Sequence, residues 1–262
     1  MSNPVERFAF ERLPNIRPAE YDARVVHSEW VTPDTLKIAF EPVGAAMFPF
    51  HPGQYVSIVL PEDADKGLKK DLRPYSMWNH PDEFEYVVTI AKMVDDGRCT
   101  SWLKTLNEGD PLKILGPLGA FYLRRPLHKR LYFVATGTGV VPLRAMVKDL
   151  ISTGEIHDRD VTLLFGVRTE ADLFGMAEFE RWAKEFPRFE FIPTLSRSAD
   201  GDGWQGARGR VTKHLAEWDF PVEDMQIYFC GNGQMIKDGI EIMEGKGLGK
   251  RTRRIVFEKY FD

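Results

Sequence analysis

The sequence predicts two domains, an antiparallel β-barrel followed by an α/β domain with a doubly wound parallel sheet. A chain of 262 residues is long enough for two domains of ordinary size. Residues 21–125 form short runs of alternating apolar and polar positions, separated by Gly, Pro, Asn and Asp, which is typical of an antiparallel barrel or sandwich. Residues 126–262 alternate continuous apolar runs with segments of helical period, which is typical of a parallel sheet covered by helices.

In the first domain, residues 1–20 are expected to form an N-terminal arm, and the boundary to the second domain is expected near 124–128. The runs expected to form barrel strands are 21–31, 35–42, 53–61, 83–94 and 110–119. One short helix is expected at 101–107, ended by Gly109.

In the second domain, five apolar runs are expected to form strands, at 131–139, 161–167, 189–196, 226–233 and 253–261. The segments of helical period between them are 142–154, 177–186 and 234–247. The run at 131–139 ends in glycines, which is the mark of a buried parallel strand followed by a tight turn.

The composition argues against several classes of protein. A formal net charge of −4 disfavours nucleic-acid binding. The only cysteines, Cys99 and Cys230, are too few for a disulfide framework or a four-cysteine iron–sulfur cluster, and no metal site is expected. No apolar run reaches the roughly 18 residues of a membrane helix. The first twenty residues lack the apolar stretch of a signal peptide, so we expect a cytoplasmic protein without membrane insertion. Its oligomeric state stays open.

Positive charges gather in two clusters despite the acidic total. The first cluster consists of Lys66, Lys69, Lys70 and Arg73, and the second of Lys246, Lys250, Arg251, Arg253 and Arg254. Each is either a solvated surface, as charge clusters usually are, or a docking face for an acidic partner.

The motif Gly-Thr-Gly-Val-Val-Pro at 137–142 follows an expected strand and opens an expected helix. Glycines let a backbone approach a pyrophosphate, whose charge the free N–H groups of a helix start can receive. Pro142 stands where the usual motif has a third glycine, and proline is tolerated in the first turn of a helix. Two glycines at such a junction can also serve packing alone. The position of the motif in the expected sheet favours nucleotide binding.

Two further motifs lie in the barrel region. Residues 73–76 read Arg-Pro-Tyr-Ser, and on a strand they would place Arg73 and Tyr75 on one face and Ser76 on the other. Residues 97–100 read Gly-Arg-Cys-Thr, directly before the expected helix, whose free N–H groups could hold a second phosphate. Each alone could be an ordinary strand or helix start.

The order of the motifs is more specific than any one of them. Arg-x-Tyr-Ser, Gly-x-x-Thr, Gly-Pro-x-Gly at 116–119, Gly-Thr-Gly-x-x-Pro and Cys-Gly-Asn at 230–232 follow one another along the chain. This order, covering residues 21 to the end, resembles the ferredoxin–NADP reductase superfamily, and most of all its bacterial flavodoxin/ferredoxin–NADP reductases. The resemblance implies an FAD-binding barrel over 21–125 and an NADP-binding sheet over 126–262.

For FAD, the resemblance implies that Tyr75 stacks on the flavin ring, Ser76 hydrogen-bonds near its N5 atom and Arg73 neutralises pyrophosphate. The other residues it assigns to FAD are Pro74, Tyr86, Val87, Val88, Arg98, Cys99, Thr100, Thr136, Tyr260 and Phe261. Residues 98–100 would cradle the pyrophosphate. The aromatic tail ending in Asp262 would cover the flavin or stack on the FAD adenine, although it could equally be an edge strand whose aromatic side chains pack.

For NADP, the resemblance implies that the glycine turn and the segment 230–235 flank the nicotinamide, with Cys230 beside the reacting carbon. A 2′-phosphate favours arginines and hydroxyls, and such groups follow three expected strand ends. The residues assigned to NADP are Gly137, Thr138, Gly139, Pro142, Val167, Arg168, Ser196, Arg197, Arg210, Cys230, Gly231, Asn232, Gly233 and Met235. Arginines at these positions favour NADP over NAD, although each alone could be a surface residue.

The function that the resemblance implies is the exchange of a hydride between NADPH and FAD, followed by transfer of single electrons to a separate carrier, ferredoxin or flavodoxin. Ser76, Cys230 and Glu258 are the expected catalytic residues. One alternative is the reductase component of an oxygenase or a free-flavin reductase, which NADH preference would favour. Another is a non-catalytic electron-transfer subunit, which absence of bound flavin would favour.

Overall fold

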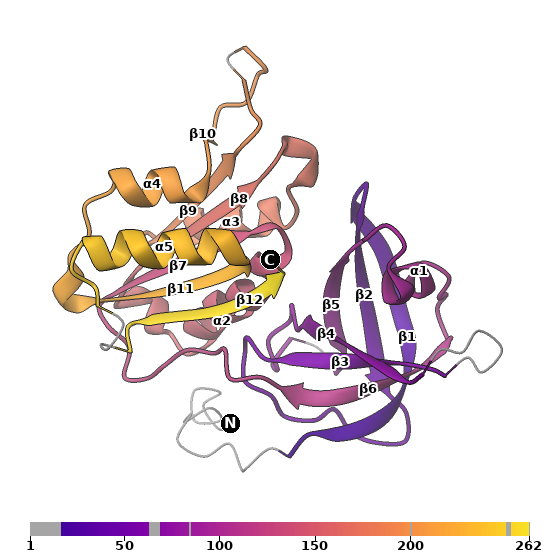
Figure 1. Cartoon of the computed structure of the whole chain (residues 1–262). Helices are drawn as coiled ribbons and strands as arrows, with labels where there is room; N and C mark the ends of the chain where they lie inside the picture. Colours follow the sequence, from indigo (N-terminus) through magenta and orange to yellow (C-terminus); the bar gives the residue numbers. More distant parts are fainter. Residues whose placement is uncertain (1–16, 63–68, 84, 200, 250–252, 262) are drawn as a thin grey trace. The chain divides into compact units, whose positions relative to one another are not determined.

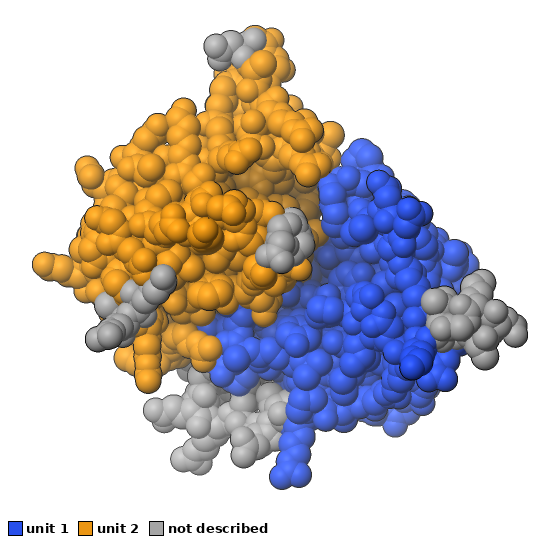
Figure 2. Space-filling model, in the orientation of Figure 1, with its two compact units in different colours: residues 1–122, 144–149 blue, residues 123–143, 150–262 orange. Residues whose placement is uncertain are grey.

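The computed structural model describes residues 17–62, 69–83, 85–199, 201–249 and 253–261 (Figure 1). Contacts divide the chain into two compact units, coloured separately in Figure 2. Unit 1 comprises residues 1–122 and 144–149, and unit 2 comprises residues 123–143 and 150–262. The division after residue 122 falls just before the expected boundary. The helix segment 144–149 groups with unit 1, because its polar side chains bond to residues 78–83, as described below.

Unit 1 contains an antiparallel sheet with the strand order β4-β3-β6-β1-β2-β5. Its strands are β1 (Ala19–Thr32), β2 (Thr35–Pro42), β3 (Tyr55–Leu60), β4 (Asp71–Ser76), β5 (Val87–Lys92) and β6 (Pro111–Leu118). Directly after β4, an antiparallel bridge joins Met77 to Thr89 of β5, and the Trp78 N–H donates to the Val88 carbonyl at 2.7 Å. The two ends of the strand order therefore meet, and the sheet closes into the predicted barrel.

The interior of the barrel is filled by apolar side chains from several strands. Val25, Phe40, Ile58, Val87 and Ile114 come from five different strands, and each is at most 1% exposed. Burying one such side chain contributes roughly 1.5–3 kcal/mol. Partly buried side chains, Tyr75 among them, pack against this core, so it also supports β4.

The helix of unit 1 lies earlier in the chain than we expected. Helix α1 spans Arg98–Leu103 instead of 101–107. The Thr100 hydroxyl donates to the carbonyls of Gly97 and Val94 at 3.1 and 3.2 Å, which turns the chain into the helix three residues sooner. At the other end, the Asp110 carboxylate accepts the Asn107 N–H at 2.7 Å and draws that residue into a turn. Side-chain bonds to the backbone thus set both ends of this helix.

Unit 2 contains a parallel sheet with the strand order β10-β9-β8-β7-β11-β12. Its strands are β7 (Arg130–Thr136), β8 (Asp160–Val167), β9 (Phe189–Leu195), β10 (Ala207–Arg208), β11 (Met225–Asn232) and β12 (Ile255–Phe261). Its helices are α2 (Val140–Ser152), α3 (Met176–Glu185), α4 (Val211–Glu217) and α5 (Gly233–Gly245). The predicted doubly wound α/β fold is therefore confirmed, whereas β10 and α4 were not predicted.

Helices α4 and α5 cover one face of this sheet (Figure 1). Val211 and Leu215 of α4 and Ile236 and Ile240 of α5 pack in one core cluster with Phe229 of β11. On α3, Phe179 packs on Phe191 of β9 with ring centroids 5.0 Å apart. In the described ranges, the structure contains no helix both long and apolar enough to cross a membrane.

The Thr89 side chain leads to a prediction about stability. It is fully buried, and its hydroxyl has no hydrogen-bond partner among the described residues. Val87 and Ala91 lie two residues away on the same strand and belong to the barrel core, so Thr89 points into that core. We expect Thr89→Val to raise the free energy of unfolding by about 1–2 kcal/mol, because valine keeps the shape and removes the unsatisfied hydroxyl. Urea unfolding of the flavin-loaded protein measures this.

Thr89→Ser is the matched control, since it keeps the hydroxyl and removes the methyl group. It should lower the free energy of unfolding by about 1 kcal/mol. A valine variant less stable than the parent would show that the hydroxyl is satisfied in solution.

Candidate functional site

The carboxyl ends of β7 and β11 are the first place where predicted motifs meet. Strand β7 lies between β8, which follows it in the chain, and β11, to which the chain returns later. Doubly wound sheets bind ligands outside the strand ends at such a reversal. β7 leads into the turn Gly137–Gly139 and then α2, whereas β11 leads directly into α5. The glycine turn and the segment 230–235 therefore lie on neighbouring strand ends.

Two glycines allow these strand ends to approach closely. A Cβ atom at Gly139 would lie 2.2 Å from the Cys230 carbonyl oxygen, and one at Gly231 would lie 2.3 Å from Thr136 Oγ1. Gly231 also has a φ of +133°, and the Asn232 N–H donates to Thr136 Oγ1 at 3.1 Å. At Gly137, with a φ of +55°, an added Cβ would meet nothing within 4 Å. A tightly held backbone with an open outer side fits the pyrophosphate of a dinucleotide.

The remaining residues of this motif pair shape the two helix starts. The Asn232 side chain accepts the Met235 N–H at 3.1 Å and caps α5, and Met235 is 7% exposed and packs in the core. Gly233 is the first residue of α5, and Pro142 is buried in the first turn of α2. Thr138 is half-buried inside the glycine turn. Asn232 and Met235 thus hold the backbone in place, which the sequence motif alone did not distinguish from ligand contact.

Cys230, Glu258 and Tyr260 come together where β11 pairs with β12. Cys230 and Glu258 are partners in the parallel register, and Cys230 has no exposed surface. Burial, and then the charge of Glu258, raises the pKa of the Cys230 thiol well above its ordinary value, although a hydrogen bond with Tyr260 acts in the opposite direction. The thiol is therefore neutral at pH 7. The tail forms an edge strand, and the side chain of Phe261 lies outside the described residues.

Exposed arginines follow the carboxyl ends of β8, β9 and β10. Arg168 follows Val167 at the end of β8, Ser196 and Arg197 follow β9, and Arg210 precedes α4. The Arg197 N–H donates to the Arg168 carbonyl at 2.9 Å, so these two residues are neighbours. Among the described residues, the guanidinium groups of Arg168, Arg197 and Arg210 have no hydrogen bond or ion pair. All three are available to a phosphate on this edge of the sheet.

In unit 1, Tyr75 and Ser76 end strand β4. Ser76 is 7% exposed and Tyr75 is half-buried. The Tyr75 hydroxyl donates to Cys99 Sγ at 3.4 Å, and burial followed by the influence of Cys99 raises the pKa of this phenol. The half-buried ring, the adjacent hydroxyl and the nearby start of α1 fit a flavin nucleotide. The structure thus brings the Arg-Pro-Tyr-Ser and Gly-Arg-Cys-Thr motifs together.

Several residues expected to hold FAD phosphates have partners inside the protein. Arg73 pairs with Asp71 at 2.5 Å and donates to the Leu72 carbonyl at 3.0 Å. Arg98 donates to the carbonyls of Lys69, at 2.7 Å, and Pro61. The Thr100 hydroxyl closes the turn before α1. The roles of these three side chains toward FAD stay predictions. Exposed Pro74 lies between Arg73 and Tyr75 on β4.

Strand β5 begins at Val87, four residues later than the run expected from residue 83, so Tyr86 precedes β5 while Val87 and Val88 lie in it. Asn79, which the sequence analysis missed, sets this start. Its side chain donates to the Tyr86 carbonyl at 3.0 Å and accepts the Val88 N–H at 2.8 Å. The amide side chain thereby takes the place of a neighbouring strand.

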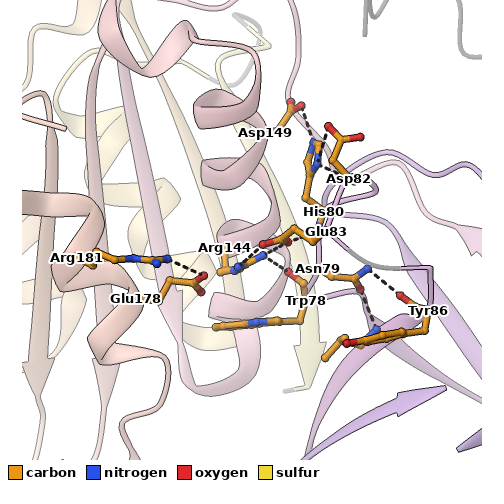
Figure 3. A network of polar contacts seen from close by, with 11 residues as sticks. Trp78, Asn79, His80, Asp82, Glu83, Tyr86, Arg144, Asp149, Glu178 and Arg181 are labelled. Carbon is orange, nitrogen blue, oxygen red and sulfur yellow. Dashed lines mark hydrogen bonds and ion pairs between the residues drawn. The ribbon is translucent and has the colours of Figure 1, made fainter. Parts of the chain in front are cut away.

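A buried polar network ties the segment after Ser76 to helix α2 (Figure 3). The Arg144 guanidinium, 3% exposed, donates with both terminal nitrogens to the Glu83 carboxylate, in one case at 2.8 Å. It also donates to the Trp78 carbonyl at 3.3 Å and lies 5.2 Å from the centre of the Trp78 ring. Beside it, the His80 ring and Asp149 approach to 3.4 Å. An arginine in the apolar run Val140–Val147 is the sequence signal that could have revealed this network.

Four of the six described residues in the two basic clusters have side-chain partners within the chain. In the first, Lys70 pairs with Glu20 at 2.7 Å and Arg73 with Asp71, whereas Lys66 lies outside the described residues. In the second, Lys246 donates to the carbonyls of Ala216 and Trp218, and Arg254 donates to those of Val222 and Glu223. Lys250 and Arg251 also lie outside the described residues, and Arg253 is exposed. Lys246 and Arg254 therefore stabilise the segment after α4, which weakens the case for a docking face.

Comparison with known proteins gives the same division of the chain. An oxidoreductase FAD-binding domain model matches residues 22–122, and an oxidoreductase NAD-binding domain model matches residues 133–239. Ferredoxin–NADP reductase B of Sorangium cellulosum is 31% identical over 254 residues, which are 94% of this chain and 99% of that protein.

Reductase components of oxygenases are similar as well. The reductase component of phenol 2-monooxygenase from Pseudomonas sp. strain CF600 is 32% identical over 216 residues, which are 81% of this chain and 58% of that protein. Among solved structures, Amycolatopsis cytochrome P450 reductase GcoB has a TM-score of 0.80 at 27% identity, with 94% of this chain and 71% of that chain covered. A ferredoxin NADP⁺ reductase from Neisseria gonorrhoeae with bound FAD and NADP has a TM-score of 0.77 at 20% identity, covering 92% of this chain and 98% of that chain, which supports the fold alone.

The Arg144–Glu83 pair generates a prediction about stability and pH. We expect Arg144→Met to lower the free energy of unfolding by about 3 kcal/mol, because it leaves the Glu83 carboxylate largely buried without its partner. The double variant Arg144→Met/Glu83→Gln removes that charge and should regain a large part of the loss. Urea unfolding of the flavin-loaded proteins at pH 7 measures both.

The pH dependence tests the cause. Burial raises the pKa of Glu83, but the hydrogen bonds and charge of Arg144 outweigh it and hold the pKa below its ordinary 4.5. A lowered carboxylate pKa stabilises the folded state above pH 4.5, and this contribution is lost as the pH falls further. The stability difference between parent and Arg144→Met should therefore shrink below pH 4.5. A difference that stays constant down to unfolding would contradict the charge explanation.

Proposed function

Because this chain belongs to the ferredoxin–NADP reductase superfamily, we propose that it oxidises NADPH through bound FAD and delivers single electrons to a separate carrier protein. It is an FAD- and NAD(P)-binding oxidoreductase, and the choice of NADPH is the more specific part of the proposal. The observation that carries it is the group formed by Arg168, Arg197 and Arg210, exposed and without partners among the described residues. A 2′-phosphate is the feature that distinguishes NADPH from NADH, and guanidinium groups bind it with charge-assisted hydrogen bonds.

The flavin supplies the conversion of a two-electron donor into one-electron transfers. In unit 1, the Tyr75 ring would pack on the flavin, and the Ser76 hydroxyl would hydrogen-bond to N5. We propose Ser76 for proton exchange at N5, and Glu258 stays a predicted catalytic residue of unit 2. In unit 2, the turns at 137–139 and 230–233 would bind the pyrophosphate and nicotinamide ends of NADPH.

Cys230 would contact the nicotinamide as a neutral thiol. It has no exposed surface, and Tyr260 is one of the groups that contact it. Access to this thiol therefore requires a covering group, such as the Tyr260 side chain, to move. The rest of the terminal strand can stay in register with β11, because backbone bonds hold it there.

For the acceptor we propose ferredoxin or flavodoxin. The similarity to ferredoxin–NADP reductase B over 99% of that protein supports this choice. The sequence contains two cysteines, which cannot supply a four-cysteine cluster. The basic residues Lys69 and Arg253, both exposed, are the remaining described candidates for contact with an acidic carrier.

The reductase component of an oxygenase is the second candidate, because relatives of that kind match as well. The toluate 1,2-dioxygenase electron transfer component of Pseudomonas putida is 27% identical over 243 residues, 92% of this chain and 68% of that protein. Preference for NADH would favour this candidate.

We predict that Arg197→Ala raises the KM for NADPH far more than the KM for NADH. Losing one charge-assisted phosphate contact should cost about 1.5–3 kcal/mol, which is roughly a 10- to 150-fold effect. Steady-state reduction of a small one-electron acceptor with each nucleotide measures it.

Arg197→Lys is the matched control for charge, since lysine keeps the charge but not the forked geometry. It should retain part of the NADPH preference. If Arg197→Ala raises the KM for NADPH and the KM for NADH equally, the 2′-phosphate does not bind at this position.

A further inference from the structure

The loop between β9 and β10 is closed by a single carboxylate. Asp202 accepts the Ser198 hydroxyl at 2.6 Å, the Ala199 N–H at 2.9 Å and the Trp204 N–H at 3.0 Å. The Ser198 hydrogen bond and then the Trp204 N–H lower the pKa of Asp202 far below its ordinary value. The carboxylate is therefore negatively charged throughout the neutral range.

Arg208 completes this closure and connects it to the sheet. Its guanidinium approaches Asp202 to 3.1 Å and donates to the Trp204 carbonyl at 2.6 Å, to the Ala199 carbonyl at 3.3 Å and to Ser198 Oγ. Arg208 lies in β10 as the register partner of Leu195, the last residue of β9. One side chain anchored on the sheet thus holds both arms of the loop.

This arrangement separates Arg208 from the other arginines of the region. Arg168, Arg197 and Arg210 have no guanidinium partner among the described residues, whereas Arg208 is engaged with Asp202 and the loop backbone. Arg197 directly precedes Ser198, and its own N–H is bound to the Arg168 carbonyl at 2.9 Å. Arg197 therefore lies between two fixed points, the end of β8 on one side and the closed loop on the other.

We propose that Asp202 and Arg208 are positioning residues that determine the preference of this chain for a 2′-phosphorylated nucleotide. Together they hold the loop in the form that presents the Arg197 guanidinium at the sheet edge. Arg208 also neutralises the Asp202 carboxylate, whose charge would otherwise repel a phosphate bound nearby. This proposal rests on the proposed 2′-phosphate site and names two residues, Asp202 and Arg208, that position it.

The test is direct binding, which needs no electron transfer. Isothermal titration calorimetry of the flavin-loaded protein with adenosine 2′,5′-bisphosphate and with 5′-AMP isolates the contribution of the 2′-phosphate. We expect Arg208→Gln to weaken bisphosphate binding about tenfold, a loss of the size expected for a charge-assisted contact, while 5′-AMP binding changes less than about twofold.

The charge argument predicts an order among three variants. Asp202→Asn should weaken bisphosphate binding less than Arg208→Gln does, because it loosens the loop without leaving an uncompensated negative charge. The double variant Asp202→Asn/Arg208→Gln should bind the bisphosphate better than Arg208→Gln alone. If Arg208→Gln binds it as well as the parent, or if the double variant is no better than Arg208→Gln, the proposal is wrong.

A control ion pair lies at the opposite ends of the strands in the same sheet. Arg188 and Asp160 form an exposed ion pair of 2.5 Å at the amino ends of β8 and β9. Arg188→Gln removes a more exposed arginine–aspartate pair and should leave binding of both ligands unchanged. A loss in Arg188→Gln as large as that in Arg208→Gln would show a general charge effect and overturn the positioning role.

Arg197→Ala separates this proposal from the one on which it rests. If Arg197→Ala loses bisphosphate affinity while Arg208→Gln does not, the result supports the 2′-phosphate site and contradicts the positioning role. If the parent binds bisphosphate no better than 5′-AMP, both proposals are wrong. If Arg208→Gln weakens both ligands equally, the pair stabilises the unit in general and selects no nucleotide.

Discussion

The approach of the β7 and β11 strand ends depends on two residues that have no side chain, Gly139 and Gly231. A Cβ atom at either position would stand 2.2–2.3 Å from an atom of the neighbouring strand end, a distance that requires the backbone to move. The parallel register between β11 and β12 then places Glu258 opposite Cys230. The same close packing brings the Asn232 N–H to Thr136 Oγ1, directly before α5 begins. We propose that this closely packed backbone receives the pyrophosphate of the nucleotide in unit 2.

The arginines of the chain divide into two kinds, and the division carries most of the functional argument. Arg98, Arg144, Arg208 and Arg254 bind backbone carbonyls or carboxylates and stabilise loops and buried segments. Arg168, Arg197 and Arg210 stand at strand ends without a partner among the described residues. An arginine with internal partners would lose them on binding a phosphate, whereas a free guanidinium already exposed at a strand end loses little. We therefore propose the second kind as the 2′-phosphate site, which basic composition alone does not single out.

Most elements could be predicted from the sequence because apolar periodicity decides them. Strand β7 and helix α2 follow directly from the change of period, although they begin one and two residues earlier than expected. Helix α1 was misplaced because its limits depend on the Thr100 hydroxyl and the Asp110 carboxylate, not on periodicity. Within each unit the structure brings neighbouring motifs together, but Arg73 and Arg98 have partners that no motif reveals. The Arg144–Glu83 pair spans 61 positions, so the local sequence signals a buried arginine in an apolar run but not its partner.

The central claim is that this chain oxidises NADPH in preference to NADH through its own bound flavin. Anaerobic rapid mixing of the flavin-loaded protein with each nucleotide, followed by flavin absorbance, tests it most directly. The account predicts fast bleaching at low NADPH concentration and bleaching by NADH only at much higher concentration. Equal bleaching by both nucleotides, or faster bleaching by NADH, would contradict the account and favour an oxygenase reductase component.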